Sequence, residues 1–347
     1  MRPSFLSLII LLLSLVACRS PEVDLEALAI VPDPYAAEDG SCPDGFRLVA
    51  NELLATGPRC LPASPSQVVA LESFEVLMAL DVPPAATLSQ FVDNHALYFP
   101  PLAGTTAGVD GIDGRGTPSA ERLLEVNPDL IIGSAQRWGA EYDTLASIAP
   151  TVLYNFEHSG LWQDVAALVA DVTGQQEAFD AQTAAYEARL TQLQQDLAEA
   201  DKVVSVVRIL PNAIRLYTLD SFAGEVIDSA GLDRPPSQQY TNAEMLAEFG
   251  QTTFYNISEE NIEMADGDVI FLWTSSGSAE ISERVDDRLN ELREDQLWGT
   301  LEAVQDGRVH EVGGYWIGSS FIAAHYMIDD LYQYVLETEP ATENPFR

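Results

Sequence analysis

The sequence predicts an α/β protein in which two lobes with parallel-rich sheets are joined by one long helix. After Pro65, short runs rich in β-branched residues alternate with helical segments, which is typical of α/β lobes with parallel sheets. Residues 175–202 break this alternation: they contain no Gly or Pro, and predict a helix of about 40 Å at 1.5 Å per residue. We therefore assign residues 66–174 to an N-terminal α/β lobe, 175–202 to a connecting helix and 203–347 to a C-terminal α/β lobe.

The chain begins with a segment typical of export. Arg2 precedes an apolar core over 5–16, which is short for a membrane span and typical of a signal peptide. The "LVAC" at 15–18 is typical of a bacterial lipoprotein box, so residues 1–17 are the predicted signal peptide and Cys18 the lipidated residue. An ordinary signal peptide with an incidental cysteine is the alternative. With the lipid, the chain is expected in the periplasm or at the cell surface, attached to the bacterial membrane only through this anchor.

Residues 18–65 form a predicted N-terminal extension that contains two further cysteines. Cys42 and Cys60 flank a strand–turn segment, and the thiols of exported proteins tend to be oxidised. We therefore expect a disulfide between them, which is worth about 3 kcal/mol in the loop-entropy model. Metal binding is the alternative, but two cysteines without a nearby pair of histidines make a poor site.

Within the lobes, apolar runs predict strands and the stretches between them predict helices. In the N-terminal lobe, strands are expected at 67–71, 129–133 and 151–155, and helices near 73–80, 117–127, 141–148 and 162–173. In the C-terminal lobe, strands are expected at 203–210, 214–219, 268–273 and 308–312, and helices from Ser221 and near 319–337. A turn at Pro211-Asn212 separates the first two strands of that lobe.

Acidic residues dominate the charge of the chain. The net charge is -37, with one lysine and sixteen arginines, and the acids are spread through the sequence. Such a surface repels nucleic acid and anionic lipid head groups, so neither is an expected partner. The excess of Asp and Glu also suggests the hypothesis that the protein works in a salty environment. Because cations are rare, an arginine on a concave surface is a candidate for ligand binding.

Two glutamates occupy matching places in the two lobes. Glu121 lies eight residues before Asp129, Glu260 lies eight residues before Asp268, and each aspartate leads into an apolar strand. Both glutamates belong to the start of a predicted helix with Ser or Thr nearby as a cap. An acid in a first turn can simply stabilise the helix dipole, which is the alternative. The repeated placement favours a shared function.

Five segments occur in a specific order: "VVALESFEVLMALDV", "GRGTPSAERLLEVNPDLIIGSAQRW", "LASIAPTVLYN", "VVRILPNAIRLYTLDSFAGEVIDSAGLDRP" and "LEAVQDGRVHEV". Together, from about residue 66 to 337, the chain resembles the substrate-binding lipoproteins of iron-siderophore ABC transporters, a family that also contains cobalamin and haem binders. The resemblance implies a helical-backbone periplasmic binding protein. In that fold a rigid helix bridges two Rossmann-like lobes, and the ligand lies in the cleft between them.

The resemblance also implies a role for the two glutamates. Each lobe of such proteins presents one acidic residue to an arginine pocket on the membrane permease. Glu121 falls on the first-lobe position and Glu260 on the second-lobe position. Glu125 and Glu259 lie close enough to be alternative assignments.

Three arginines are candidate ligand contacts. Ligands of open α/β sheets bind beyond the carboxyl ends of the strands, where Arg137 lies, and Arg115 precedes a helix on the same rim. Arg208 interrupts an apolar strand, so it either pairs with an acid of the core or faces the cleft. The resemblance implies that Arg137 and Arg208 point into the cleft. For Arg115, capping or loop structure is the alternative.

Aromatic side chains are candidates for covering the apolar parts of a ligand. We expect contacts from Trp138, Tyr217, Trp273 and Trp316, and the three tryptophans are favoured because they follow strands or precede a Gly-Ser loop. Core packing is the alternative for each of them.

These features predict non-catalytic capture of a ferric siderophore, of an anionic carboxylate or citrate-hydroxamate type, and its delivery to an ABC permease. Guanidinium groups suit such ligands because they stay charged and bind oxygen pairs in a two-pronged geometry. The iron is expected to arrive chelated, with no cofactor and no direct metal site, because the four histidines are scattered. We expect a monomer.

Two alternatives stay open. Cobalamin or haem is the alternative ligand within the same family, although three candidate cleft arginines favour a more anionic one. An exported α/β hydrolase is the alternative from another class. The sequence contains no G-x-S-x-G elbow, no metal-spaced set of histidines and no phosphate loop, so an enzyme is not predicted.

Overall fold

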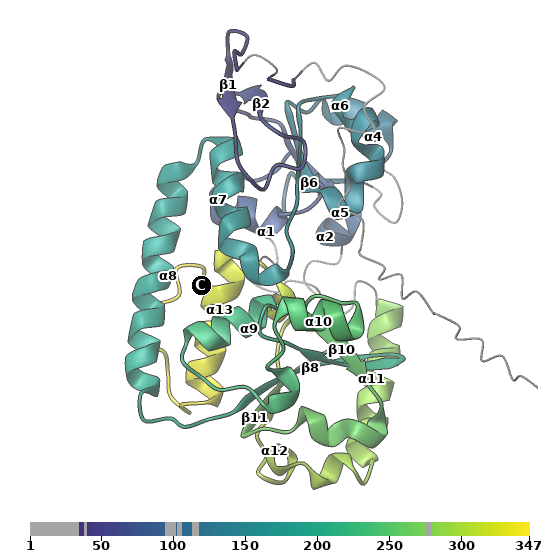
Figure 1. Cartoon of the computed structure of the whole chain (residues 1–347), viewed down its shortest axis with the longest axis vertical. Coiled ribbons are helices and arrows are strands. Elements are labelled where there is room, and N and C mark those ends of the chain that lie inside the picture. The colour runs from purple at the N-terminus through teal and green to yellow at the C-terminus, as the bar shows by residue number, and fades with distance from the viewer. Residues whose placement is uncertain (1–34, 38–39, 94–101, 103–105, 113–117, 275–278) are drawn as a thin grey trace, which may run out of the picture.

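The computed structural model describes residues 35–37, 40–93, 102, 106–112, 118–274 and 279–347. It contains two five-stranded sheets that lie toward opposite ends of the molecule, and helix α8 runs along one side of both (Figure 1). The predicted fold class is confirmed. Within the described residues, no helix is both long enough and apolar enough to cross a membrane. The signal peptide, Cys18 and Arg115 lie outside this part of the chain.

The first sheet is entirely parallel, with the strand order β5-β4-β3-β6-β7. Its strands are β3 (Val68–Ala70), β4 (Ala86–Leu88), β5 (Asp110–Ile112), β6 (Leu130–Ser134) and β7 (Thr151–Tyr154). The sequence predicts β3, β6 and β7. It does not predict β4 and β5, because strands of three residues are too short to show a hydrophobic period.

Helices cover both faces of this sheet. Leu130 and Ile132 of β6 pack with α1 and α7 on one face, whereas Ile131 packs with α4, α5 and α6 on the other, as alternation along a strand requires. The helices are α1 (Phe74–Ala79), α2 (Ser89–Asp93), α4 (Ala120–Val126), α5 (Ala135–Trp138), α6 (Tyr142–Ala146) and α7 (Trp162–Thr173).

The second sheet is mixed, with the strand order β10-β9-β8-β11-β12. β8 (Val204–Leu210), β11 (Val269–Trp273) and β12 (Val309–Glu311) are parallel, whereas β9 (Ala213–Tyr217) and β10 (Phe254–Ile257) are antiparallel to their neighbours. The turn at Pro211-Asn212 explains the change of direction, because a two-residue loop joins antiparallel strands only. The helices of this lobe are α9 (Phe222–Ser229), α10 (Asn242–Phe249), α11 (Ala279–Glu294), α12 (Glu302–Gln305) and α13 (Phe321–Tyr334).

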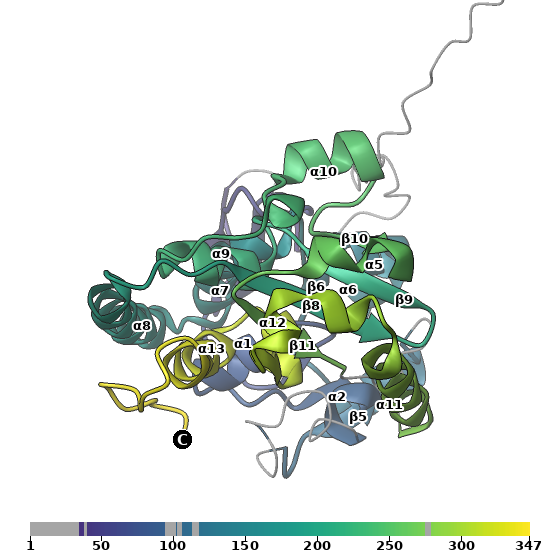
Figure 2. The ribbon, with the colours of Figure 1, turned by 90° about the horizontal axis from the view of Figure 1, so that it is seen from below.

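α8 (Gln176–Leu197) is the helix predicted at 175–202, and it ends earlier than predicted. Its 22 residues span about 33 Å at 1.5 Å per residue. It lies beside α13 (Figure 2), where buried Arg189 donates hydrogen bonds to Asp329 at 2.6 Å and to the His325 carbonyl at 3.0 Å. Because α13 also contacts α1 of the first lobe, the C-terminal helix is a second bridge between the lobes.

One apolar core is shared by the two lobes. The indole of Trp162 on α7 packs edge-on against Tyr186 of α8, Phe222 of α9 and Phe321 of α13, with ring centres 5.3, 5.6 and 5.1 Å away. The first lobe, the connecting helix, the second lobe and the C-terminal helix therefore meet at one side chain. Any change in lobe orientation has to repack this close-packed cluster.

The N-terminal extension packs on the first lobe. It forms a hairpin of β1 (Phe46–Val49) and β2 (Arg59–Pro62), and a disulfide joins Cys42 to Cys60. Between the two strands, the amide of Ala55 donates to the Leu153 carbonyl of β7 at 2.9 Å. The extension thereby supports the strand that ends in Tyr154, a residue of the cleft described below.

Candidate functional site

Two adjoining cavities lie between the lobes, at the edge where parallel strands of α/β sheets present their carboxyl ends to ligands. The first-lobe cavity has a volume of about 280 Å³ and is bounded across the cleft by Ile317, Gly318 and Ser319 of the second lobe. The second-lobe cavity has a volume of about 190 Å³ and lies beside β8 and β9. Ser159 and Ile317 line both cavities, so the two form one interlobe cleft.

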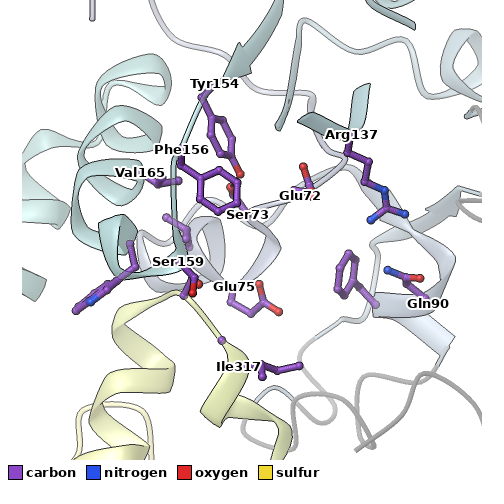
Figure 3. A pocket seen from close by; sticks show the side chains of 15 residues that line it. Glu72, Ser73, Glu75, Gln90, Arg137, Tyr154, Phe156, Ser159, Val165 and Ile317 are labelled. Carbon is purple, nitrogen blue, oxygen red and sulfur yellow. Dashed lines mark hydrogen bonds between the residues drawn. The ribbon is translucent and has the colours of Figure 1, made fainter. Parts of the chain in front are cut away.

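Polar side chains from three strand ends line the first-lobe cavity. Glu72 and Ser73 follow β3, Arg137 lies in the short helix after β6, and Tyr154 is the last residue of β7. Figure 3 shows the carboxylate of Glu75, from the first turn of α1, and the guanidinium of Arg137 directed toward the open centre of the cavity. The predicted contact Arg137 is therefore joined here by two carboxylates that the sequence did not single out.

Burial controls the protonation of this cavity. The pKa of Glu75 is raised because burial disfavours the charged form of its carboxyl. The pKa of Tyr154 is raised above its usual range by burial and by the charge of Glu72, so the phenol keeps its proton. The hydroxyls of Ser73 and Tyr154 share a hydrogen bond of 2.7 Å, and Glu72 accepts one of 2.7 Å from the backbone amide of Ser134.

The sequence does carry a signal for Glu72 and Glu75. They lie in "LESFE", directly after the predicted strand 67–71, just as Arg137 directly follows another predicted strand. The sequence-based prediction considers only arginines as charged ligand contacts, and so it does not include these two glutamates.

Two arginines line the second-lobe cavity together. Arg208 of β8 and Arg215 of β9 are register partners, so their side chains leave the same face of the sheet, with Cβ atoms about 5 Å apart. Arg208 thus faces the cleft rather than the core. The Nε of Arg215 donates to Asn256 at 3.2 Å, and its guanidinium carbon lies 4.2 Å from the centre of the Phe254 ring. Arg215 was not predicted, although it interrupts "IRLYTL" as Arg208 interrupts its own strand.

In each lobe a cleft arginine lies over a buried tryptophan. The guanidinium carbon of Arg137 is 4.7 Å from the centre of the Trp138 ring, and that of Arg208 is 5.0 Å from the Trp273 ring. The two tryptophans are 3% and 1% exposed, and neither is among the residues that line the cavities. Each indole supports a guanidinium from below through a cation–π contact. The expectation that Trp138 and Trp273 themselves contact the ligand stays a prediction.

Tyr217 and Trp316, the other two expected aromatic contacts, do line the second-lobe cavity. Trp316 is held in place by stacking on Phe271, with ring centres 4.3 Å apart, and by a hydrogen bond of 2.7 Å from its Nε1 to Asp330. Burial raises the pKa of Asp330 to about 6, although hydrogen bonds from Trp316 and Tyr315 lower it.

Hydrogen bonds join the lobes beside the cleft. The amide of Gly160 donates to the Asp220 carbonyl at 2.9 Å, and the amide of Phe222 donates to the Ser159 hydroxyl at 3.0 Å. A Cβ atom at position 160 would lie 3.0 Å from the Asp220 oxygen, so this approach favours glycine. The junction holds Ser159, which lines both cavities, in a defined position.

Glu121 and Glu260 have matching local structures. Each is exposed and is the second residue of a helical turn that follows a serine, Ser119 or Ser258. Each turn follows a strand, β5 or β10, whose carboxyl end lies at the cleft edge of its sheet. Their alternatives are engaged elsewhere, since Glu125 pairs with Arg122 and Glu259 with Arg288. In the described part of the chain, neither Glu121 nor Glu260 forms an ion pair.

No group of three or more His, Cys, Asp or Glu side chains among the described residues could hold a metal ion. Of the predicted ligand contacts, Arg137, Arg208, Tyr217 and Trp316 thus line one interlobe cleft, together with Glu72, Glu75 and Arg215.

Comparison with known proteins agrees with this architecture. The family described as periplasmic binding protein matches residues 68–315. The Bacillus subtilis (strain 168) protein named probable siderophore-binding lipoprotein YfiY is 32% identical over 284 residues, covering 80% of this chain and 85% of YfiY. The Fe(3+)-citrate-binding protein YfmC of the same organism is 22% identical over 262 residues, 74% of this chain and 75% of YfmC. The crystal structure of Staphylococcus aureus SirA complexed with staphyloferrin B has a similar fold, with a TM-score of 0.71 and 22% identity over 84% of this chain and 99% of SirA. The chain therefore belongs to the periplasmic binding protein family.

Proposed function

We propose that this chain is the substrate-binding component of an ABC importer and captures a ferric siderophore in the interlobe cleft. The observation that carries the proposal is the position of three arginines. Arg137 lines the interlobe cleft from the first lobe, and Arg208 and Arg215 line it from the second lobe. A chain with a net charge of -37 has few cations to place there. The names of YfiY and YfmC support the same class of ligand.

The ligand presents carboxylate or hydroxamate oxygens, which guanidinium groups bind in pairs. Cavities of about 280 and 190 Å³ together fall within the range of small-molecule sites, roughly 300–1,000 Å³. Tyr217 and Trp316 cover the apolar parts of the ligand. The iron enters already chelated, as cargo, and the protein acts by binding rather than by catalysis, as its family does.

Delivery to the permease uses the exposed carboxylates of Glu121 and Glu260, one on each lobe. Both lie at the cleft edge of the molecule, so a permease that contacts them lies over the mouth of the cleft. The protein works as a monomer, held at the membrane by the lipid on Cys18.

Tryptophan fluorescence tests the proposal, because Trp162 and Trp316 line the two cavities. The mature domain, without its lipid, is titrated with ferric citrate, ferric carboxylate and citrate-hydroxamate siderophores, haem and cobalamin. We expect saturable quenching by one or more of the ferric siderophores. Quenching by haem or cobalamin alone would contradict the proposal.

A further inference from the structure

The two cavities of the cleft differ in charge. The first-lobe cavity is lined by two acids, Glu72 and Glu75, and one cation, Arg137. The second-lobe cavity is lined by two cations, Arg208 and Arg215, and by no acid among the described residues. A ligand that spans the cleft therefore meets an acidic half and a basic half.

The acids of the first-lobe cavity outnumber its one cation. Glu72 accepts a hydrogen bond from the Ser134 amide, and in the described part of the chain neither Glu72 nor Glu75 forms an ion pair. Both side chains are half-buried, and burial raises the pKa of Glu75. With two acids and one cation in a partly desolvated cavity, this half of the cleft favours a ligand that brings positive charge.

The second-lobe cavity has the opposite requirement. Arg208 and Arg215 are directly opposed on neighbouring strands, and both line this cavity. An anionic group that enters it meets two guanidinium groups, which bind oxygen anions in pairs.

From these two halves we infer that the preferred siderophore carries separated charges. Its carboxylate or hydroxamate oxygens lie at Arg208, Arg215 and Arg137, and a protonated amine or similar cationic group lies at Glu72 and Glu75. Ser159 and Ile317 border both cavities, so one molecule can reach both ends. This inference rests on the proposed function and narrows its ligand class.

The acidic half also discriminates against fully anionic ligands. A carboxylate placed beside Glu72 and Glu75 meets like charges in a partly desolvated site, where repulsion is stronger than in water. Specificity then arises from what the first lobe repels as well as from what it attracts.

The test compares two ligands that differ at one amine: the ferric complex of a citrate-hydroxamate siderophore bearing a free, protonated primary amine, and its N-acetylated form, in which the amine is a neutral amide. Isothermal titration of the wild-type mature domain is expected to show at least about tenfold weaker binding of the N-acetylated form. In the Glu72→Gln/Glu75→Gln variant this difference should disappear. Glu157→Gln, which removes an exposed acid that lines neither cavity, serves as the control and should keep the difference.

The outcomes separate the two levels of the proposal. Equal affinity of the wild type for both forms overturns the inference and leaves siderophore binding intact. Binding of neither form, nor of any other ferric siderophore, overturns both. The wild-type comparison needs no variant, so it stands even if the double variant fails to fold. Melting temperatures of all three proteins report on that.

Discussion

Arg208 and Arg215 are direct register partners on the antiparallel strands β8 and β9, and both line the cavity beside the second lobe. Two guanidinium groups side by side provide a two-cation site for an anion. The pairing depends on the turn at Pro211-Asn212, which reverses the chain and sets the register. A local feature of the sequence thereby positions the charge that the ligand meets.

Arg215→Ala should weaken binding of an anionic ferric siderophore by about 10- to 100-fold, since a hydrogen bond to a charged group contributes roughly 1.5–3 kcal/mol. The melting temperature should change little, because the partly exposed side chain loses only a hydrogen bond to Asn256 and a contact with Phe254. Isothermal titration and thermal unfolding measure the two effects. Arg293→Ala, which changes a half-exposed residue of α11 that lines neither cavity, is the control and should leave affinity unchanged. Undiminished affinity in Arg215→Ala would remove this residue from the site.

Charge reversal at Glu121 and Glu260 should abolish uptake without changing ligand affinity. The Glu121→Arg/Glu260→Arg variant presents cations where the permease is proposed to present arginines, and both positions are exposed and outside the cavities. Uptake of iron-labelled siderophore by cells and titration of the purified variant measure the two properties. Glu125→Arg, on the same helix as Glu121, should retain most of the uptake. Loss of ligand binding in the double variant would argue against a docking role.

Gly160→Ala should destabilise the junction between the lobes. The new methyl group would lie 3.0 Å from the Asp220 oxygen, and overpacking of this kind costs about 1–3 kcal/mol. Gly299→Ala is a close control, because Gly299 also lies in the middle of a three-residue 3-10 helix and a Cβ there meets nothing within 4 Å. Urea unfolding of both variants measures the difference. Equal stability would show that the junction yields without cost.

Asp330 should make stability depend on pH in a defined direction. Burial raises its pKa from 3.8 to about 6, so the folded state holds the proton more tightly than the unfolded state. The carboxyl therefore contributes stability that is fully present below about pH 4 and is lost as the pH rises through 6, on the order of 2–3 kcal/mol. The free energy of unfolding of the wild type, relative to Asp330→Asn, should fall between pH 4 and pH 7. A constant difference would contradict the assignment.

Much of the fold is predictable because its main elements carry long, regular patterns. The strands β6, β8 and β11 are runs of mainly apolar residues, and α8 is a long stretch without helix breakers. The short strands β4, β5 and β10 are not predictable in this way, since their pairing is decided by neighbours distant in sequence. The return of α13 to the first lobe is likewise a tertiary contact that no local pattern records.

The site divides along a similar line. Position at a strand end identifies Arg137 and Arg208, but it does not tell which way a neighbouring side chain points. In the helical turn of α5, consecutive residues are rotated by about 100°, so an exposed Arg137 places Trp138 in the core. The direction of Trp273 was unpredictable for the same reason: it is the last residue of β11, and its side chain is buried beneath Arg208.

The central claim is that arginines from both lobes hold a ferric siderophore in the cleft between them. The most direct measurement is isothermal titration of an anionic ferric siderophore into the wild-type mature domain and the Arg137→Ala/Arg208→Ala variant, with circular dichroism to verify the fold. We predict at least about 100-fold weaker binding in a variant that remains folded. Unchanged affinity in the folded variant would contradict the claim.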